Sequence, residues 1–268
     1  MNEFIAALQL PFMQNALIAG LAVAAMSGLL GVFMVQRRMS FLGDGLAHSA
    51  FGGVALALFL GVSQPLWLAL PFALVVALGI TFVRERTGLS NDTTIGIFFA
   101  VSVALGVLFV SLKRDYTVDA WHWLFGSILG VSRGDLWIIL GVTLISMAAL
   151  SYLWQQLAYA TFDEELAATD GVRVRRLEYT LLALAALIIV ASVRVVGVIL
   201  MAAYLVIPAA AARLLSKSLF TMTLLSVLIG IVSTALGLVV SFFLDVPSGS
   251  TIVLTQASFF IVAALFKK

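Results

Sequence analysis

Long apolar runs separated by short polar or Gly/Pro-containing breaks extend over most of the chain. Nine runs can be read, at 14–36, 41–62, 64–83, 93–112, 135–154, 178–194, 195–212, 219–244 and 250–266. A bilayer core of about 30 Å needs roughly 20 apolar residues per helix, so each run is a candidate membrane span. The runs 178–194 and 195–212 are near the lower length limit, and either one is a candidate for a short or re-entrant helix. The pattern predicts an all-α fold, a polytopic transmembrane helical bundle of eight or nine spans, with 1–268 as a single transmembrane domain.

Composition agrees with this fold and excludes several classes of function. Hydrophobic residues make up 63% of the 268 residues and charged residues only 10%, whereas soluble domains carry about 25% charged residues. Little chain remains for a soluble catalytic domain, and without a basic block or a low-complexity run we expect no nucleic-acid partner and no disorder. The chain has no cysteine, which excludes disulfides, thiolate metal sites and cysteine nucleophiles.

The positive charges predict an orientation. If Arg37 and Arg38 are cytoplasmic, alternation of nine spans places 11 of the 15 basic residues on the same side. This positive-inside bias predicts a multi-pass protein of the plasma or inner membrane with a cytoplasmic C-terminus and an outer N-terminus. Merging one pair of spans would move the N-terminus inside.

Two further patterns predict packing and a cytoplasmic element. Gly20, Ala24 and Gly28 recur at the spacing of close helix contacts in membranes, and we expect them to pack within the bundle rather than between copies. The break 155–177 is predicted to be a cytoplasmic loop. Its core, 162–170, predicts a short helix with acidic residues in its first turn and Gly171 just after its end.

Asp44 and His48 are the polar residues least expected inside a span. A central Asp costs about 2.5–3.5 kcal/mol on insertion scales, so such residues normally face a bundle interior or a water-filled path. Their spacing of four residues places both on one helix face. One interpretation is a site for a divalent cation, because imidazole plus carboxylate suits zinc and also allows manganese. The alternative is a mutually satisfied pair in which Asp44 orients His48.

A single copy would supply only these two ligands, whereas zinc usually takes four. We therefore hypothesise a symmetric dimer that brings both pairs to its axis, giving two nitrogen and two oxygen ligands.

The remaining polar candidates are weaker. Asp119 and His122 are three residues apart in the outer break 113–134, but the tryptophans on both sides of His122 favour an interfacial aromatic belt. Asp92 follows Asn91 at the start of a run and is interpreted as a helix N-cap. No GxxxxGK[ST] loop, GxSxG elbow or HExxH pair occurs, so an enzyme is not expected and ATP would have to be hydrolysed by another chain.

Six segments together resemble one known family. They are RRMSFLGDGLAHSAFGGVALA (37–57), NDTTIGIFFAVSVALGV (91–107), VDAWHWLFGSIL (118–129), DEELAATDGV (163–172), VGVILMAAYLVIPAAAARLL (196–215) and DVPSGSTIVLTQASFFIVAAL (245–265). In this order they resemble the integral-membrane permeases of zinc and manganese ABC importers, over nearly the whole chain. The resemblance implies a type II-like permease that works as a homodimer with a cytoplasmic ABC ATPase and an extracytoplasmic metal-binding protein. It also implies Zn²⁺ or Mn²⁺ as the transported substrate, with no permanently bound cofactor.

The resemblance assigns roles to single residues. It places the intramembrane metal ligands at Asp44 and His48, and Asp119 and His122 become candidates for an outer gate. The family's coupling segment, E-A-A-x-x-x-G, is matched by Glu165, Ala167 and Gly171 with Leu166 replacing the first alanine, so the acidic helix that includes Asp163 and Glu164 is the expected ATPase-coupling element. Some zinc-type members have a histidine shortly after the NDTTIGI-like motif, where this chain has Phe99, Ala100 and Val101. Zinc is our first expectation and manganese the second, because nitrogen ligands favour zinc.

Two other functions remain open on the sequence. An ion-gradient-driven secondary metal transporter would relay protons through Asp44 and His48 and would need no ATPase. An ABC permease for an iron chelate or corrinoid would need a wide apolar cavity, and its uptake would survive Asp44→Asn.

Overall fold

The computed structural model describes residues 10–113, 126, 128–198 and 200–266, and within them every regular element is a helix. Their bounds are α2 Pro11–Gln36, α3 Leu42–Phe59, α4 Leu66–Thr87, α5 Asn91–Leu112, the 3₁₀ turn η1 Ile128–Gly130, α7 Arg133–Tyr152, α8 Trp154–Phe162, α9 Glu164–Thr169, α10 Val174–Val196, α11 Met201–Leu215, α12 Leu219–Leu244 and α13 Ser248–Leu265. The all-α expectation is confirmed.

Eight helices in the described part are long and apolar enough to cross a membrane, namely α2, α3, α4, α5, α7, α10, α12 and α13. The ninth apolar run forms α11, which has only 15 residues and contains Pro208. Of the two runs near the lower length limit, 178–194 belongs to the long helix α10, whereas 195–212 forms the short α11. The run 178–194 was read too short, because α10 begins at Val174 and has 23 residues.

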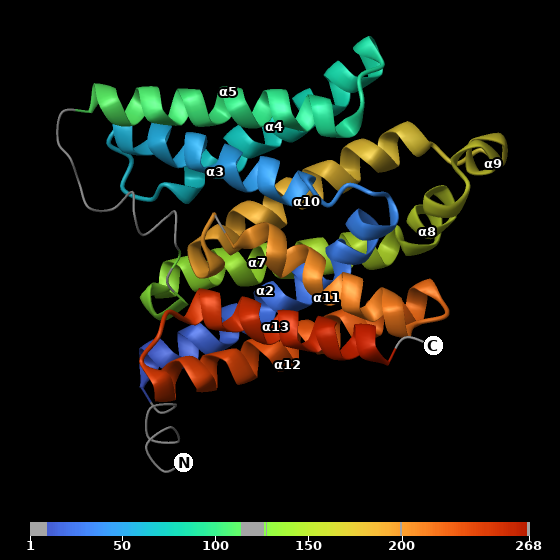
Figure 1. Cartoon of the computed structure of the whole chain (residues 1–268). Helices are drawn as coiled ribbons and strands as arrows, with labels where there is room; N and C mark the ends of the chain where they lie inside the picture. Colours follow the sequence, from blue (N-terminus) through green and yellow to red (C-terminus); the bar gives the residue numbers. More distant parts are fainter. Residues whose placement is uncertain (1–9, 114–125, 127, 199, 267–268) are drawn as a thin grey trace.

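The helices form a bundle built around α2 (Figure 1). α2 packs against α7, α10, α11 and α12, while α3, α4 and α5 form a layer on one side and α12 and α13 lie on the other. The predicted small-residue contacts lie within the chain, as expected. A Cβ atom on Gly28 would come within 3.0 Å of the Val227 backbone in α12, so this glycine lets the two helices approach closely.

Ion pairs join helices at both ends of the bundle. At one end the buried Asp135 completes a capping box with Ser132 at the start of α7, and its Oδ2 lies 3.3 Å from Arg194 Nε in the last turn of α10. At the other end Arg84 of α4 pairs with Glu178 of α10. The interpretation of Asp92 as an N-cap was wrong by two residues. Ser90 caps α5, its Oγ accepting from Thr93 N at 3.2 Å, and Asp92 lies in the first turn.

Candidate functional site

Asp44 and His48 lie in the first two turns of α3, which is held tightly by its neighbours. A Cβ on Gly45 would meet the Ile95 side chain of α5 at 2.4 Å, and one on Gly53 would meet Ala69 Cα of α4 at 2.7 Å. The glycines of this helix therefore allow α4 and α5 to pack directly on its backbone. This packing fixes the position from which Asp44 and His48 project.

The ring of His48 is oriented by backbone rather than by the neighbouring carboxylate. His48 Nδ1 lies 3.0 Å from the carbonyl oxygen of Asp44. A carbonyl can only accept, so Nδ1 donates its proton, and in the neutral ring Nε2 keeps a free lone pair. This is the arrangement that fixes the tautomer of a metal-binding histidine.

The Asp44 carboxylate is left available. Among the described residues it has no hydrogen-bond or ion-pair partner, and both Asp44 and His48 are half-exposed. The mutually satisfied pair considered from the sequence is therefore not what the side chains form. The two residues present one oxygen donor group and one nitrogen donor on the same face.

The neighbouring helix adds an aromatic ring instead of a third ligand. Phe99 of α5 makes an edge contact with His48, with ring centroids 4.7 Å apart, and Phe41 lies beside Phe99. No group of three His, Cys, Asp or Glu side chains able to hold a metal occurs within residues 10–113, 126, 128–198 and 200–266. The described part of one copy thus offers two candidate ligands at this place, Asp44 and His48. Asp119 and His122 lie outside the described residues.

The predicted acidic helix is present as α9. Asp163 caps it, since its Oδ1 accepts from Leu166 N at 2.9 Å. Gly171 ends it with φ +84°, and the amides of Gly171 and Val172 return to the carbonyls of Ala168 and Ala167, which is a Schellman motif. Ala167 is buried, whereas Glu164 and Glu165 are exposed. The helix therefore presents its acidic face outward.

A second tie holds the end of α9. Tyr159 Oη donates to Asp170 Oδ2 at 2.5 Å. That hydrogen bond, together with the negative charge of Asp170, raises the pKa of Tyr159 to about 12. The phenol stays protonated at neutral pH, so the tie is independent of physiological pH.

α8 connects α9 to the turn that leads into α3. Trp154 of α8 packs edge-on against Phe33 of α2, with ring centroids 5.3 Å apart. Arg37, just after α2, donates from Nε to Thr161 Oγ1 at 2.9 Å, while its buried Nη2 has no partner in the described part. Burial lowers the pKa of Arg37, although Glu178 and Glu164 oppose this. Four residues separate Arg37 from Leu42, the first residue of α3.

Sequence reasoning missed the contacts of Phe99, Arg37 and Thr161. Arg37 was counted only as a marker of orientation, because a charge at the end of an apolar run looks the same whether it is solvated or buried. The only sequence signal for a structural role of Arg37 is its position seven residues before Asp44. The partner of Arg37 lies 124 residues further along the chain, and no local pattern encodes that pairing.

Comparison with known proteins agrees with this architecture. Residues 9–267 match the model of the ABC 3 transport family. The chain is 38% identical to the "Manganese import system permease protein ScaB" of Streptococcus parasanguinis over 98% of this chain and 93% of that protein. It is 35% identical to the "High-affinity zinc uptake system membrane protein ZnuB" of Haemophilus influenzae over 94% of this chain and 96% of that protein.

A solved structure gives the same fold. The structure described as "PsaBC from Streptococcus pneumoniae in complex with Fab" matches with a TM-score of 0.87 and 37% identity, covering 98% of this chain and 94% of that chain. The family match covers nearly every residue, and the fold, the spans and the motif order all agree with it. The chain is therefore a multi-pass permease subunit, not itself an enzyme, and it belongs to the ABC 3 transport family.

Proposed function

We propose that this permease imports a divalent first-row metal ion, with Asp44 and His48 as its ligands in the membrane. The observation that carries the proposal is a carboxylate without a partner among the described residues, together with the Nε2 lone pair, on one half-exposed face of α3. Oxygen and nitrogen donors suit both Mn²⁺ and Zn²⁺. The expectation of zinc before manganese is not retained, because proteins named for manganese import and for zinc uptake match the chain about equally well.

The active unit in this proposal is a homodimer. Two copies related by a two-fold axis would bring two carboxylates and two imidazoles together and complete a four-ligand shell. The side chains that surround His48 leave this face open to a partner, since Phe41 is 43% exposed and Ala100 and Val101 are exposed. Asp119 and His122 remain a prediction for an outer gate.

Coupling to ATP hydrolysis would pass through α9. An ABC ATPase on the cytoplasmic side would bind the exposed cap residue Asp163 and the exposed Glu164 and Glu165 of α9. Movement of α9 would reach α8 and then Arg37 through the Thr161 hydrogen bond, and so shift the start of α3. An extracytoplasmic binding protein would deliver the ion at the opposite end, and the C-terminus would be cytoplasmic with the basic majority.

The decisive experiment is metal uptake by the reconstituted transporter. The permease, its ATPase and its binding protein are placed in proteoliposomes, and Mn²⁺ and Zn²⁺ uptake is followed with and without ATP. We expect Asp44→Asn and His48→Ala each to lower ATP-dependent uptake at least about tenfold, because each copy loses one of its ligands. Asp92→Asn is the matched control, an exposed acid in the first turn of α5, and should leave uptake unchanged.

The same assay separates the alternatives. Uptake by the permease alone under an ion gradient would favour a secondary transporter. Undiminished metal uptake in both the Asp44→Asn and the His48→Ala variants would refute the proposed site. The ratio of Mn²⁺ to Zn²⁺ uptake identifies the preferred ion.

A further inference from the structure

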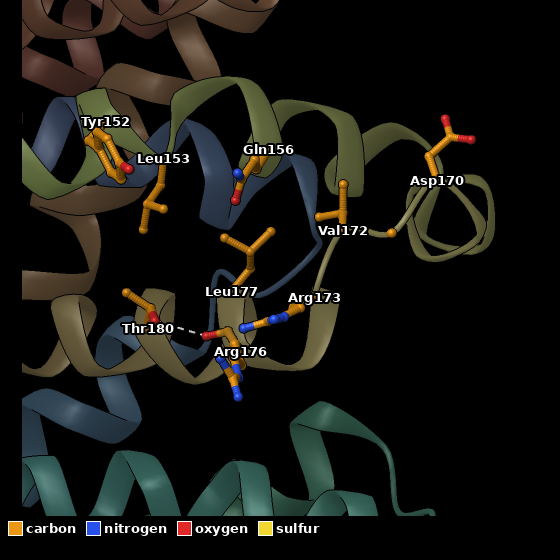
Figure 2. Close-up of a pocket in the computed structure, with 10 residues that line it drawn as sticks. Tyr152, Leu153, Gln156, Asp170, Val172, Arg173, Arg176, Leu177 and Thr180 are labelled. Carbon is orange, nitrogen blue, oxygen red and sulfur yellow. Dashed lines mark hydrogen bonds between the residues drawn. The ribbon is translucent and has the colours of Figure 1, made fainter.

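A cleft of about 770 Å³ lies between the start of α10 and the segment that joins α7 to α8 (Figure 2). Tyr152 and Gln156 line one wall, Leu177 lies on the α10 side, and Arg173 and Arg176 lie at the first turn of α10. This is the end of the bundle that also carries α9. The metal site and the coupling path use none of these five residues.

Two arginines of the cleft carry positive charge that no described acidic side chain neutralises. Arg175, between the two cleft arginines, is held by Glu85 through two hydrogen bonds of 2.9 and 2.7 Å. Arg173 and Arg176 have no ion-pair partner in the part of the chain that the structure describes. In Figure 2 the Asp170 carboxylate points away from both arginines, and it accepts the hydrogen bond from Tyr159. Arg173 also gives no side-chain cap to α10, so the first-turn amides add to the positive end.

The walls of the cleft continue into the apolar surface of the bundle. α7 and α10 pack against each other. On α7, Ile145 is 60% exposed and Tyr152 88% exposed, two turns apart on one face. On α10, Thr180 and Leu187 are half-exposed at helical spacing from Arg176. A ligand whose charged end occupied the cleft could therefore extend an apolar tail along both membrane-spanning helices.

We propose that the cleft binds an anionic phospholipid, with its phosphate between Arg173 and Arg176 and its acyl chains along α7 and α10. Guanidinium groups recognise phosphate with paired hydrogen bonds, and the exposed phenol of Tyr152 has the amphipathic character of residues at the headgroup level. Basic clefts between spanning helices at the cytoplasmic leaflet are typical sites for such headgroups. The proposal uses the orientation given under the proposed function. It does not use the metal site, so lipid binding and metal uptake can fail independently.

The test compares lipids retained by the purified transporter. The permease with its ATPase is placed in nanodiscs of equal parts phosphatidylglycerol and phosphatidylcholine, and the lipids bound after mild detergent extraction are counted by native mass spectrometry. We expect the wild type to retain phosphatidylglycerol preferentially. In Arg173→Ser/Arg176→Ser the preference should fall roughly 25-fold, about fivefold per arginine. Arg86→Ser/Lys217→Ser removes the same charge from exposed positions outside the cleft and should keep the preference.

Three results would overturn the proposal. The first is an equal phosphatidylglycerol preference in the wild type and the cleft variant. The second is displacement of the bound lipid by millimolar inorganic phosphate, which would make the cleft a site for soluble anions. The third is loss of ATPase association in the cleft variant with the lipid preference intact, which would make it a protein-docking surface. An unchanged melting temperature in pure phosphatidylcholine shows that the variant is folded, as expected for two exposed arginines with no ion-pair partner among the described residues.

Discussion

α2 and α5 are almost equally apolar, yet they occupy opposite environments. Their mean hydropathies over the most apolar 18 residues are 2.2 and 2.6, but 83% of that stretch is buried in α2 and only 17% in α5. α2 carries small residues where neighbours cross it, and α5 presents larger side chains such as Ile97, Val101 and Leu108 outward. Apolarity thus decides whether a helix enters the membrane, and small residues decide which helices surround it. α5 also contacts the proposed metal ligand His48 through Phe99, so in the proposed function its low burial concerns transport as well as packing.

The largest effect should come from adding one methyl group to α2. A Cβ on Gly31 would lie 2.1 Å from the carbonyl oxygen of Leu205 in α11, whereas a Cβ on Gly96 of α5 meets nothing within 4 Å. Because Gly31 faces backbone, Gly31→Ala must push two helices apart, which costs about 2 kcal/mol or more. Gly96→Ala should be neutral or slightly stabilising. The measurement is the melting temperature and the yield of monodisperse protein in detergent. Equal losses for both variants would contradict the role given to the small residues of α2.

Some features of the fold and of the candidate site could be predicted from the sequence. Hydropathy and the break positions predicted eight or nine spans and marked 178–194 and 195–212 as the pair in which one helix could be short. The acidic run with Gly171 predicted α9. All these signals are local. The position of Asp44 and His48 on the same face of one helix also follows from their spacing alone. The edge contact of Phe99 with His48 and the Arg37–Thr161 hydrogen bond depend on how distant helices pack. No local pattern specifies those contacts.

In the proposed homodimer, a second copy covers the exposed side of α3 and α5. The chain has no cysteine, so single cysteines report proximity without background. Phe41 lies one turn before Asp44 on the same face, and Phe41→Cys should cross-link two copies in membranes under oxidation, because the proposed axis passes near Asp44 and His48. Leu144→Cys on α7 is the control, and it is more exposed, at 75%. Non-reducing electrophoresis provides the readout. A cross-link at Leu144 but not at Phe41 would place the dimer axis on the other side of the bundle.

A smaller effect is expected from substitutions at the C-terminal ends of α2 and α5. Both are followed by a basic residue with one hydrogen bond to another helix, Arg37 to Thr161 of α8 and Lys113 to the Leu58 carbonyl of α3 at 2.8 Å. Arg37 joins α8 to the turn before Asp44 and His48, the proposed metal ligands, whereas Lys113 fastens α3 to α5 at the far end. Arg37→Ala should therefore lower metal uptake per ATP hydrolysed several-fold without abolishing ATP hydrolysis. Lys113→Ala should lower stability by about 1 kcal/mol and leave that ratio unchanged.

The two variants separate coupling from packing if uptake and ATP hydrolysis are measured on the same proteoliposomes. Arg37→Lys gives an intermediate test, because an ammonium group keeps the charge but lacks the planar donor that reaches Thr161. Thr161→Val removes the acceptor from the other side, and in the double variant with Arg37→Ala it should add little to the loss. Additive losses would mean that Arg37 acts through its charge on Glu178 and Glu164 rather than through α8. In that case the buried end of α2 would influence the proposed metal site electrostatically, and α9 would have to reach α3 by another route.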